Sequence, residues 1–117
     1  MTSGGPVRPE RHALLQLDAL LERVEQLAVA EDRARYDGDD VYRWALHRLW
    51  IAIGNEAYAY CRLVGLDVNR DRPWARLYQL RCWLAHDRLP DVDEDFVWRM
   101  SKLGVVSVRA RVQAVMR

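Results

Sequence analysis

The sequence predicts an all-α fold, a bundle of four to five helices that forms one domain. Apolar residues recur at intervals of three and four along most of the chain, which is the spacing of a buried helix face. The few glycines and prolines fall between these periodic segments rather than inside them. With 117 residues, half of them hydrophobic, the chain supports one core and is too short for two independent ones.

The N-terminal part predicts a leader and one long helix. Residues 1–9 contain glycine, proline and serine and are expected to form a flexible leader, after which the single helical domain covers residues 10–117. Apolar residues at helical spacing predict an amphipathic helix over residues 10–35. Turn-forming residues at positions 36–39 predict the end of this helix.

The middle of the chain predicts two further helices. The first covers residues 41–64, with Asp39 or Asp40 suited to cap its start and Gly65 suited to the left-handed conformation at its end. The next covers residues 74–86 and follows a proline, which fits the first turn of a helix.

The C-terminal part predicts a fourth helix and a tail with two interpretations. Asp93 is suited to cap the fourth helix, which is expected to stop near Gly104. The valines of residues 105–117 match a helical stripe, but some of them also alternate as in a strand. A helix is the preferred prediction, because the preceding segments offer no strand with which this one could pair.

The composition excludes several classes of protein. Eighteen basic and seventeen acidic residues give a net charge of +1, so contact with nucleic acid requires a local patch rather than a basic coat. Cys61 and Cys82 are too few for a disulfide framework or a structural zinc site, and both are expected to be buried, reduced thiols. No apolar stretch is long enough to span a membrane and the N-terminus lacks the core of a signal peptide, which predicts a cytosolic protein.

Two charged residues interrupt the predicted apolar faces. At about 100° per residue, Arg81 falls in the middle of the apolar arc of its helix, and Glu56 falls among the apolar residues of the preceding helix. One interpretation is a buried structural ion pair, or two side chains that extend to the rim of the core. The functional alternative is that Glu56 holds Arg81 in a fixed pose for a reaction or a ligand.

One histidine is a candidate for chemistry. His86 follows Arg81 by five residues, an offset of about 140° and 7.5 Å in a regular helix, so the two side chains should diverge. They could share a site if the helix ends at His86, or if two protomers contribute across an interface. Apolar residues around most of this helix favour the second arrangement. A capping or surface role is the alternative for His86, and His12 and His47 are expected at the surface.

The rest of the sequence offers little chemistry. It contains no glycine-rich phosphate loop, no serine-nucleophile motif and no histidine pair at metal-ligand spacing. The acidic run at residues 91–95 lacks the pattern of a calcium loop, so helix capping explains it, and no metal or cofactor is expected. Arg70, Arg72 and Arg88 lie in or near the loops that flank the third helix. They could form a basic patch near His86, with surface solubility as the alternative.

The middle of the chain resembles the HepT-like family of HEPN domains. The resemblance depends on the segment WARLYQLRCWLAHDRLPDVDEDFVW at residues 74–98. The family hallmark is an arginine and a histidine separated by four to six residues, and Arg81 and His86 match it with four between them. Upstream, IAIGNEAYAY at residues 51–60 is similar to the second-helix signature of the family, so that the resemblance covers residues 41–103.

The resemblance implies a homodimer that forms through the helices bearing the motif and cleaves RNA without a metal ion. Such proteins are toxins of prokaryotic toxin–antitoxin pairs, with a nucleotidyltransferase as the antitoxin. Arg81 would stabilise the charge that develops on the phosphate, and His86 would act as general acid or base. Glu56 would support this pair, and Arg88 would add positive charge that binds RNA.

Two positions depart from the family pattern. Cys82 stands where the family often has a polar residue directly after the arginine. Arg88 stands where many members have a tyrosine to which the nucleotidyltransferase adds AMP. The alternative function is therefore a catalytically silent HEPN dimer that binds a nucleotidyltransferase or nucleic acid. Without that tyrosine, an antitoxin is expected to act by occluding the cleft or by modifying another residue.

Overall fold

The computed structural model describes residues 8–117. The predicted leader therefore lies outside the described residues, except at its last two positions. Arg8 is the N-cap of the first helix, α1 (Pro9–Ala28), and Pro9 is its first residue. A proline is well suited to that position, because the first N–H groups of a helix have no partner within the helix.

The first helix is shorter than predicted. α1 ends at Ala28, and a separate short helix, α2 (Arg33–Gly38), covers most of the predicted break. The side chain of Asp32 accepts a hydrogen bond of 3.1 Å from the backbone N–H of Arg35, which caps α2 at its start. The prediction of one helix to residue 35 is wrong, because this cap begins a new helix within the periodic segment.

A distant lysine stabilises the break between α1 and α2. Lys102 Nζ donates hydrogen bonds to the carbonyl oxygens of Val29, at 2.7 Å, and Glu31, at 2.6 Å. The last carbonyl groups of a helix have no partner within it, so an ammonium group in this place satisfies them and interacts favourably with the helix dipole.

The two central helices form as predicted. α3 (Asp40–Val64) is capped by Asp39, whose side chain accepts a hydrogen bond of 3.0 Å from the backbone N–H of Tyr42. It ends at Gly65, which has φ of 77°, a conformation that favours glycine. α4 (Trp74–His86) packs along α3.

The C-terminal part forms one continuous helical segment with a widened turn in its middle. α5 (Glu94–Arg99) is capped by Asp93, as predicted, and continues through the π-helical turn η2 (Met100–Gly104) into α6 (Val105–Met116). Gly104 has φ of −62° and stays helical, so the predicted stop at this residue is wrong. The prediction of a helical tail is confirmed.

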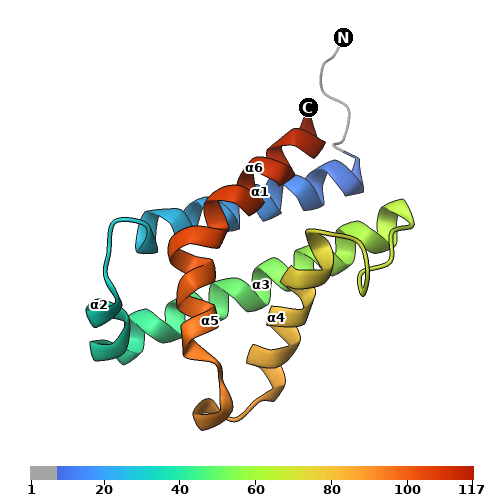
Figure 1. Cartoon of the computed structure of the whole chain (residues 1–117). Helices are drawn as coiled ribbons and strands as arrows, with labels where there is room; N and C mark the ends of the chain where they lie inside the picture. The colour runs from blue at the N-terminus through green and yellow to red at the C-terminus, as the bar shows by residue number, and fades with distance from the viewer. Residues whose placement is uncertain (1–7) are drawn as a thin grey trace.

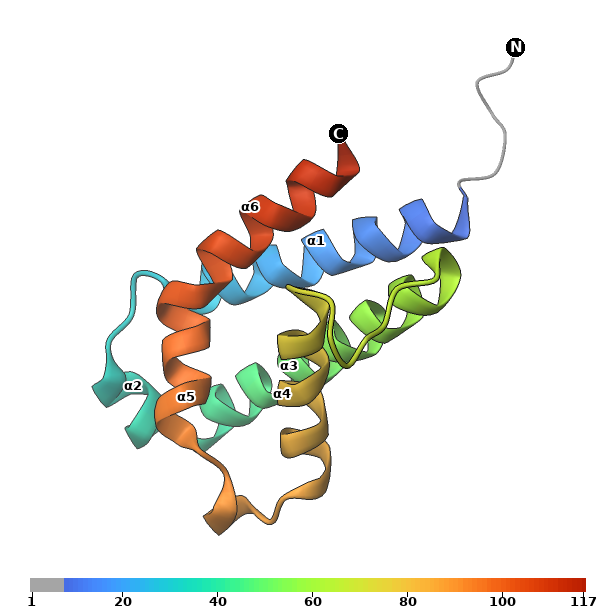
Figure 2. The same ribbon diagram turned by 45° about the vertical axis from the view of Figure 1, so that its right-hand side comes forward.

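The helices pack into an elongated bundle of 52 × 28 × 21 Å. α1 contacts both α3 and α6, and α4 contacts α3 (Figure 1). The loop from α4 to α5, which contains the short helix η1 (Leu89–Asp91), lies at the end of the molecule opposite the C-terminus (Figure 2). No helix in the described part is long and apolar enough to cross a bilayer. The largest side chains that are fully buried are Trp50, Tyr36, Leu17, Leu21, Leu46, Ile53, Leu77 and Leu80.

Candidate functional site

Arg81 lies where α3 and α4 approach each other most closely. A Cβ atom at Gly54 would lie 2.1 Å from Cβ of Arg81 and 2.8 Å from the carbonyl oxygen of Leu77. Only a residue without a side chain fits between the two backbones at this point. The stem of Arg81 is therefore held against the backbone of α3, which restricts the directions that its guanidinium can take.

The guanidinium of Arg81 binds Asn55 rather than Glu56. Its Nε donates a hydrogen bond of 2.8 Å to Oδ1 of Asn55. None of the ion pairs formed within residues 8–117 joins Arg81 to Glu56, and both side chains are half-buried rather than buried. The predicted Glu56–Arg81 pair is wrong. Neighbouring helix positions are about 100° apart, so Asn55 and Glu56 face different directions, and Asn55 is the one that faces Arg81.

His86 and Arg88 lie at the far end of α4. His86 is the last residue of the helix, and both side chains are exposed. Because α4 is regular up to His86, its side chain and that of Arg81 point about 140° apart and are separated by about 7.5 Å along the axis. A single chain therefore does not bring the arginine and the histidine together.

Two exposed aromatic rings lie on the same side of α3 as Asn55. Trp44, Asn55 and Tyr58 lie on one side of α3 at helical spacing, and Trp44 and Tyr58 are 47% and 37% exposed. The ring of Tyr58 stacks on Tyr78 of α4, with 5.2 Å between the ring centroids. The predicted motif thus lies on a surface with exposed apolar rings.

The two cysteines differ in their surroundings. Cys61 is a buried free thiol, as predicted, and burial raises its pKa to about 11, with smaller contributions from Asp71 and Asp67. Cys82 is free but only half-buried, so the prediction of a buried thiol is wrong at this position. The predicted apolar circumference of α4 is partly open to solvent on the side of Cys82.

His47 belongs to a buried polar cluster that sequence reasoning missed. It was expected at the surface, but it is 8% exposed. Its Nε2 lies 2.8 Å from Oε1 of Glu94, and Tyr36 donates a hydrogen bond of 2.5 Å to the same oxygen. Burial and, next, the bond to Glu94 raise the pKa of the Tyr36 hydroxyl. The expectation for His47 is wrong, because α2 and α5 cover this part of α3. The available signal was that His47 precedes Trp50 by three residues, a spacing that places the two side chains on nearby sides of the helix.

The acidic run that contains Glu94 stabilises the fold. Asp93 caps α5, Glu94 binds the buried cluster, and Asp95 accepts a hydrogen bond of 2.6 Å from Arg33. Within residues 8–117, no group of three His, Cys, Asp or Glu side chains is arranged to hold a metal ion. Compared with known proteins, the chain matches no protein family, no curated protein and no solved structure.

Proposed function

We propose that this chain is an RNA-cleaving protein of the HEPN type, built on a dimer of helical bundles. The observation that supports this most is the state of Arg81. Its stem is fixed at the crossing of α3 and α4, its Nε is bound by Asn55, and no carboxylate of the described residues neutralises it. A preorganised guanidinium with free terminal NH₂ groups is suited to stabilise a phosphate whose charge increases in a transition state.

The second copy supplies what one chain lacks. Arg81 and His86 point in different directions within one helix, so a combined site requires a partner whose motif meets the first across an interface. The exposed rings of Tyr58, three residues from Asn55, and of Trp44, nearer the start of α3 on the same side, provide apolar surface for such a contact. A symmetric dimer places the same patch on both subunits, which brings two copies of each motif residue to one cleft.

The proposed reaction is a transfer within the RNA strand. The 2′-oxygen forms a bond to the adjacent phosphorus, and the bond from phosphorus to the 5′-oxygen breaks. One copy of His86 accepts the proton of the 2′-hydroxyl, and the other donates a proton to the leaving 5′-oxygen. Arg81 stabilises the phosphoryl oxygens as their charge increases. Arg88 adds positive charge two residues beyond His86 and favours binding of the strand.

Purified protein and two pairs of variants test this function. Arg81→Ala and His86→Ala should each reduce the rate of RNA cleavage by about 10²–10⁴-fold, the range for loss of a charge-stabilising or acid–base group. The matched controls, Arg23→Ala and His12→Ala on the exposed face of α1, should cleave at the rate of the parent. Excess EDTA should leave cleavage unchanged, and induced expression in a prokaryotic host should slow growth only in the cleaving variants.

Loss of cleavage in EDTA would contradict the metal-independent reaction. A protein that is dimeric by sedimentation but cleaves no RNA would instead favour the second candidate, a catalytically silent HEPN dimer. Cys82, where the family often has a polar residue, and Arg88, where it often has the tyrosine, favour that candidate. Its proposed partner is a nucleotidyltransferase encoded by a neighbouring gene, which would occlude the cleft without adding AMP at position 88.

A further inference from the structure

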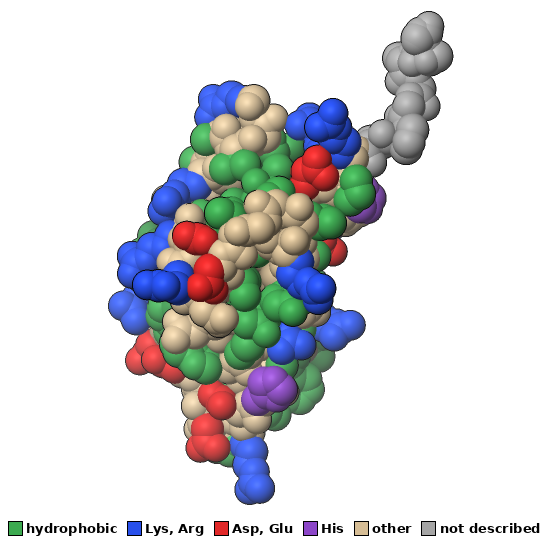
Figure 3. Space-filling view, turned by 90° about the vertical axis from the view of Figure 1, so that its right-hand side faces the viewer, with side chains coloured by type: hydrophobic (Ala, Val, Ile, Leu, Met, Phe, Trp, Pro, Cys, Tyr) green, Lys and Arg blue, Asp and Glu red, His purple; other side chains and the backbone are tan. Residues whose placement is uncertain are grey.

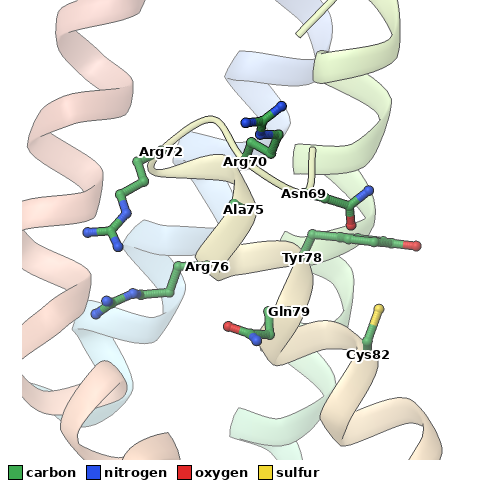
Figure 4. Close-up of a pocket in the computed structure, with 8 residues that line it drawn as sticks. All are labelled: Asn69, Arg70, Arg72, Ala75, Arg76, Tyr78, Gln79 and Cys82. Atoms are coloured by element: carbon green, nitrogen blue, oxygen red, sulfur yellow. The ribbon is translucent and has the colours of Figure 1, made fainter. Parts of the chain in front are cut away.

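A polar hollow of about 420 Å³ lies along α4 and the loop before it, and Tyr78 and Cys82, close to Arg81 in sequence, are among its lining residues. It extends from the loop before α4 to the middle of that helix. The residues that line it are Asn69, Arg70, Arg72, Ala75, Arg76, Tyr78, Gln79 and Cys82 (Figure 4). We call it the arginine hollow. In the view of Figure 3, basic side chains lie along both edges of the molecule.

A smaller hollow of about 160 Å³ adjoins the first between α4 and α6. Arg72 and Arg76 line both hollows, and Ser107 and Arg111 of α6 line the smaller one. The side chains of Arg72 and Arg76 extend to the same side of α4 (Figure 4). Two segments that are distant in sequence, residues 70–76 and α6, therefore place four arginines around two neighbouring hollows, and these are Arg70, Arg72, Arg76 and Arg111.

These four arginines have no carboxylate partner within residues 8–117. The salt bridges of this part use other arginines, such as Arg33, Arg43 and Arg109. The nearest acidic residues in sequence, Asp67 and Asp71, bind their own loop. Asp71 accepts a hydrogen bond of 2.7 Å from the backbone N–H of Asp67, and Asp67 accepts one of 2.9 Å from that of Asn69. These hydrogen bonds leave both carboxylates charged, so four arginines stand against two carboxylates, and positive charge predominates here in a protein whose net charge is only +1.

We propose that the arginine hollow binds the phosphates of single-stranded RNA and guides the strand toward His86. Ala75, Gln79, Cys82 and His86 lie on one face of α4 at helical spacing, so the hollow opens along the face that ends at His86. The face spans about 16 Å from Ala75 to His86 at 1.5 Å per residue, a length over which a strand places several phosphates. The direction toward His86 rests on the proposed function, whereas phosphate binding by the hollow does not.

The other lining groups favour a single strand over a free anion. Arginines bind phosphate through paired N–H groups, and four of them are more than one phosphate requires. The aromatic ring of Tyr78 and the amide groups of Asn69 and Gln79 are the types of side chain that stack on unpaired bases and hydrogen-bond their edges. Arg72 and Arg76 extend to one side of α4, and Asn69 and Tyr78 extend to the other (Figure 4). A strand along the hollow would therefore have groups for its phosphates on one side and groups for its bases on the other.

Binding is best measured in the His86→Ala background, in which the strand stays intact. The probe is a fluorescein-labelled oligouridine of twelve nucleotides, followed by anisotropy. The double variant Arg72→Gln/Arg76→Gln should bind it at least tenfold more weakly, and the slope of log K against log salt should fall by about one. The control Arg23→Gln/Arg99→Gln, which removes two exposed arginines of α1 and α5, should bind like the His86→Ala parent. Equal affinity of the two double variants would overturn the proposal.

Two further results separate this proposal from the proposed function. In the first result, the RNA binds to the His86→Ala protein, the double variant loses this binding, and the protein with His86 cleaves no RNA. Binding at the arginine hollow is then supported and the ribonuclease function is contradicted. If the protein cleaves RNA and Arg72→Gln/Arg76→Gln leaves KM unchanged, the function stands and the hollow is overturned. Uridine monophosphate and inorganic phosphate serve as short probes. An affinity that does not increase from these probes to the twelve-nucleotide strand overturns the assignment to RNA.

Discussion

Two regions of the molecule use basic side chains in opposite ways. At the end formed by α2, α5 and the start of α3, Arg43 and His47 both lie near Glu94, whose Oε1 also accepts the Tyr36 hydroxyl. Along the outer side of α4, the arginines have no such carboxylate. Whether a basic residue stabilises the fold or remains available to a ligand thus depends on where the acidic residues lie.

The same contrast between paired and unpaired arginines occurs within α6. Arg109 of α6 contacts Asp18, Glu22 and Glu25 of α1 at 2.9, 2.7 and 3.3 Å. Asp18 and, to a smaller extent, Glu25 raise the pKa of Arg109 further. Two turns of a helix therefore hold three carboxylates around one guanidinium. Arg111, only two residues further along α6, lines the smaller hollow beside the arginine hollow instead. The two directions are about 160° apart on the helix, which separates a structural arginine from an available one.

The largest effect is expected in the buried cluster of Tyr36, His47 and Glu94, on removal of the Glu94 carboxylate. Glu94→Ala leaves the Tyr36 hydroxyl and His47 without their shared acceptor in a buried place, so the free energy of unfolding should fall by about 2–4 kcal/mol. The matched control is Asp95→Ala at the next position. Its ion pair with Arg33 is exposed, and the loss should stay below about 1 kcal/mol.

Urea unfolding of the two variants measures both losses on the same scale. Equal midpoints for Glu94→Ala and Asp95→Ala would show that the cluster contributes no more than a surface ion pair. The buried cluster around Glu94 would then stabilise the fold no more than the exposed pair of Asp95 and Arg33 does.

The next effect is a dependence on alkaline pH. The pKa of Tyr36 is raised in the folded protein, by burial first and by the bond to Glu94 second, above the value of about 10 in an unfolded chain. A group whose pKa is raised by folding contributes fully below the unfolded pKa, and its contribution is lost as the pH rises above it. The parent should therefore lose stability above pH 10 by up to about 1.4 kcal/mol more per pH unit than Tyr36→Phe.

Thermal unfolding of both proteins from pH 8 to pH 11 gives this difference. Tyr42, Tyr60 and Cys61 also have raised pKa values and destabilise both proteins alike, so only the difference between the curves reports Tyr36. Parallel curves would place the Tyr36 hydroxyl in contact with water.

The helices were predictable from the sequence because their signals are local. Asp39, Asp93 and Gly65 act on backbone groups within a few residues, and the periodicity of residues 41–64 reports a face that the fold does bury. The break after Ala28 was not predictable in the same way. Its local signal, the Asp32 that caps α2, lies inside the periodic segment, and Lys102, which binds the carbonyl groups of Val29 and Glu31, is distant in sequence and reaches them only in the folded chain.

The candidate site was predictable as a position but not as a set of contacts. Periodicity placed Arg81 facing α3, and this is correct. The choice between Asn55 and Glu56 as its partner depends on how α3 and α4 cross at Gly54, which the pattern of a single helix does not contain. The two neighbouring hollows were also not predictable, because Arg76 of α4 and Arg111 of α6 line the smaller one together only in the folded chain.

The smallest expected effect is a change in the labelling rates of the two thiols, one in the core and one in the arginine hollow. Cys61 is 1% exposed and its pKa is raised to about 11, so at pH 7.5 it is both inaccessible and almost wholly protonated. Cys82 is half-buried and lines the arginine hollow, so a maleimide should label it first.

Saturating single-stranded RNA in the His86→Ala protein should slow the labelling of Cys82 several-fold, because the strand covers the hollow, and should leave the labelling rate of Cys61 unchanged. Mass spectrometry of the labelled peptides assigns each rate to its cysteine. Labelling of Cys82 at the same rate with and without bound RNA would place the strand elsewhere on the surface. Labelling of Cys61 at a faster rate than Cys82 would show that the core around Cys61 is more accessible than the hollow.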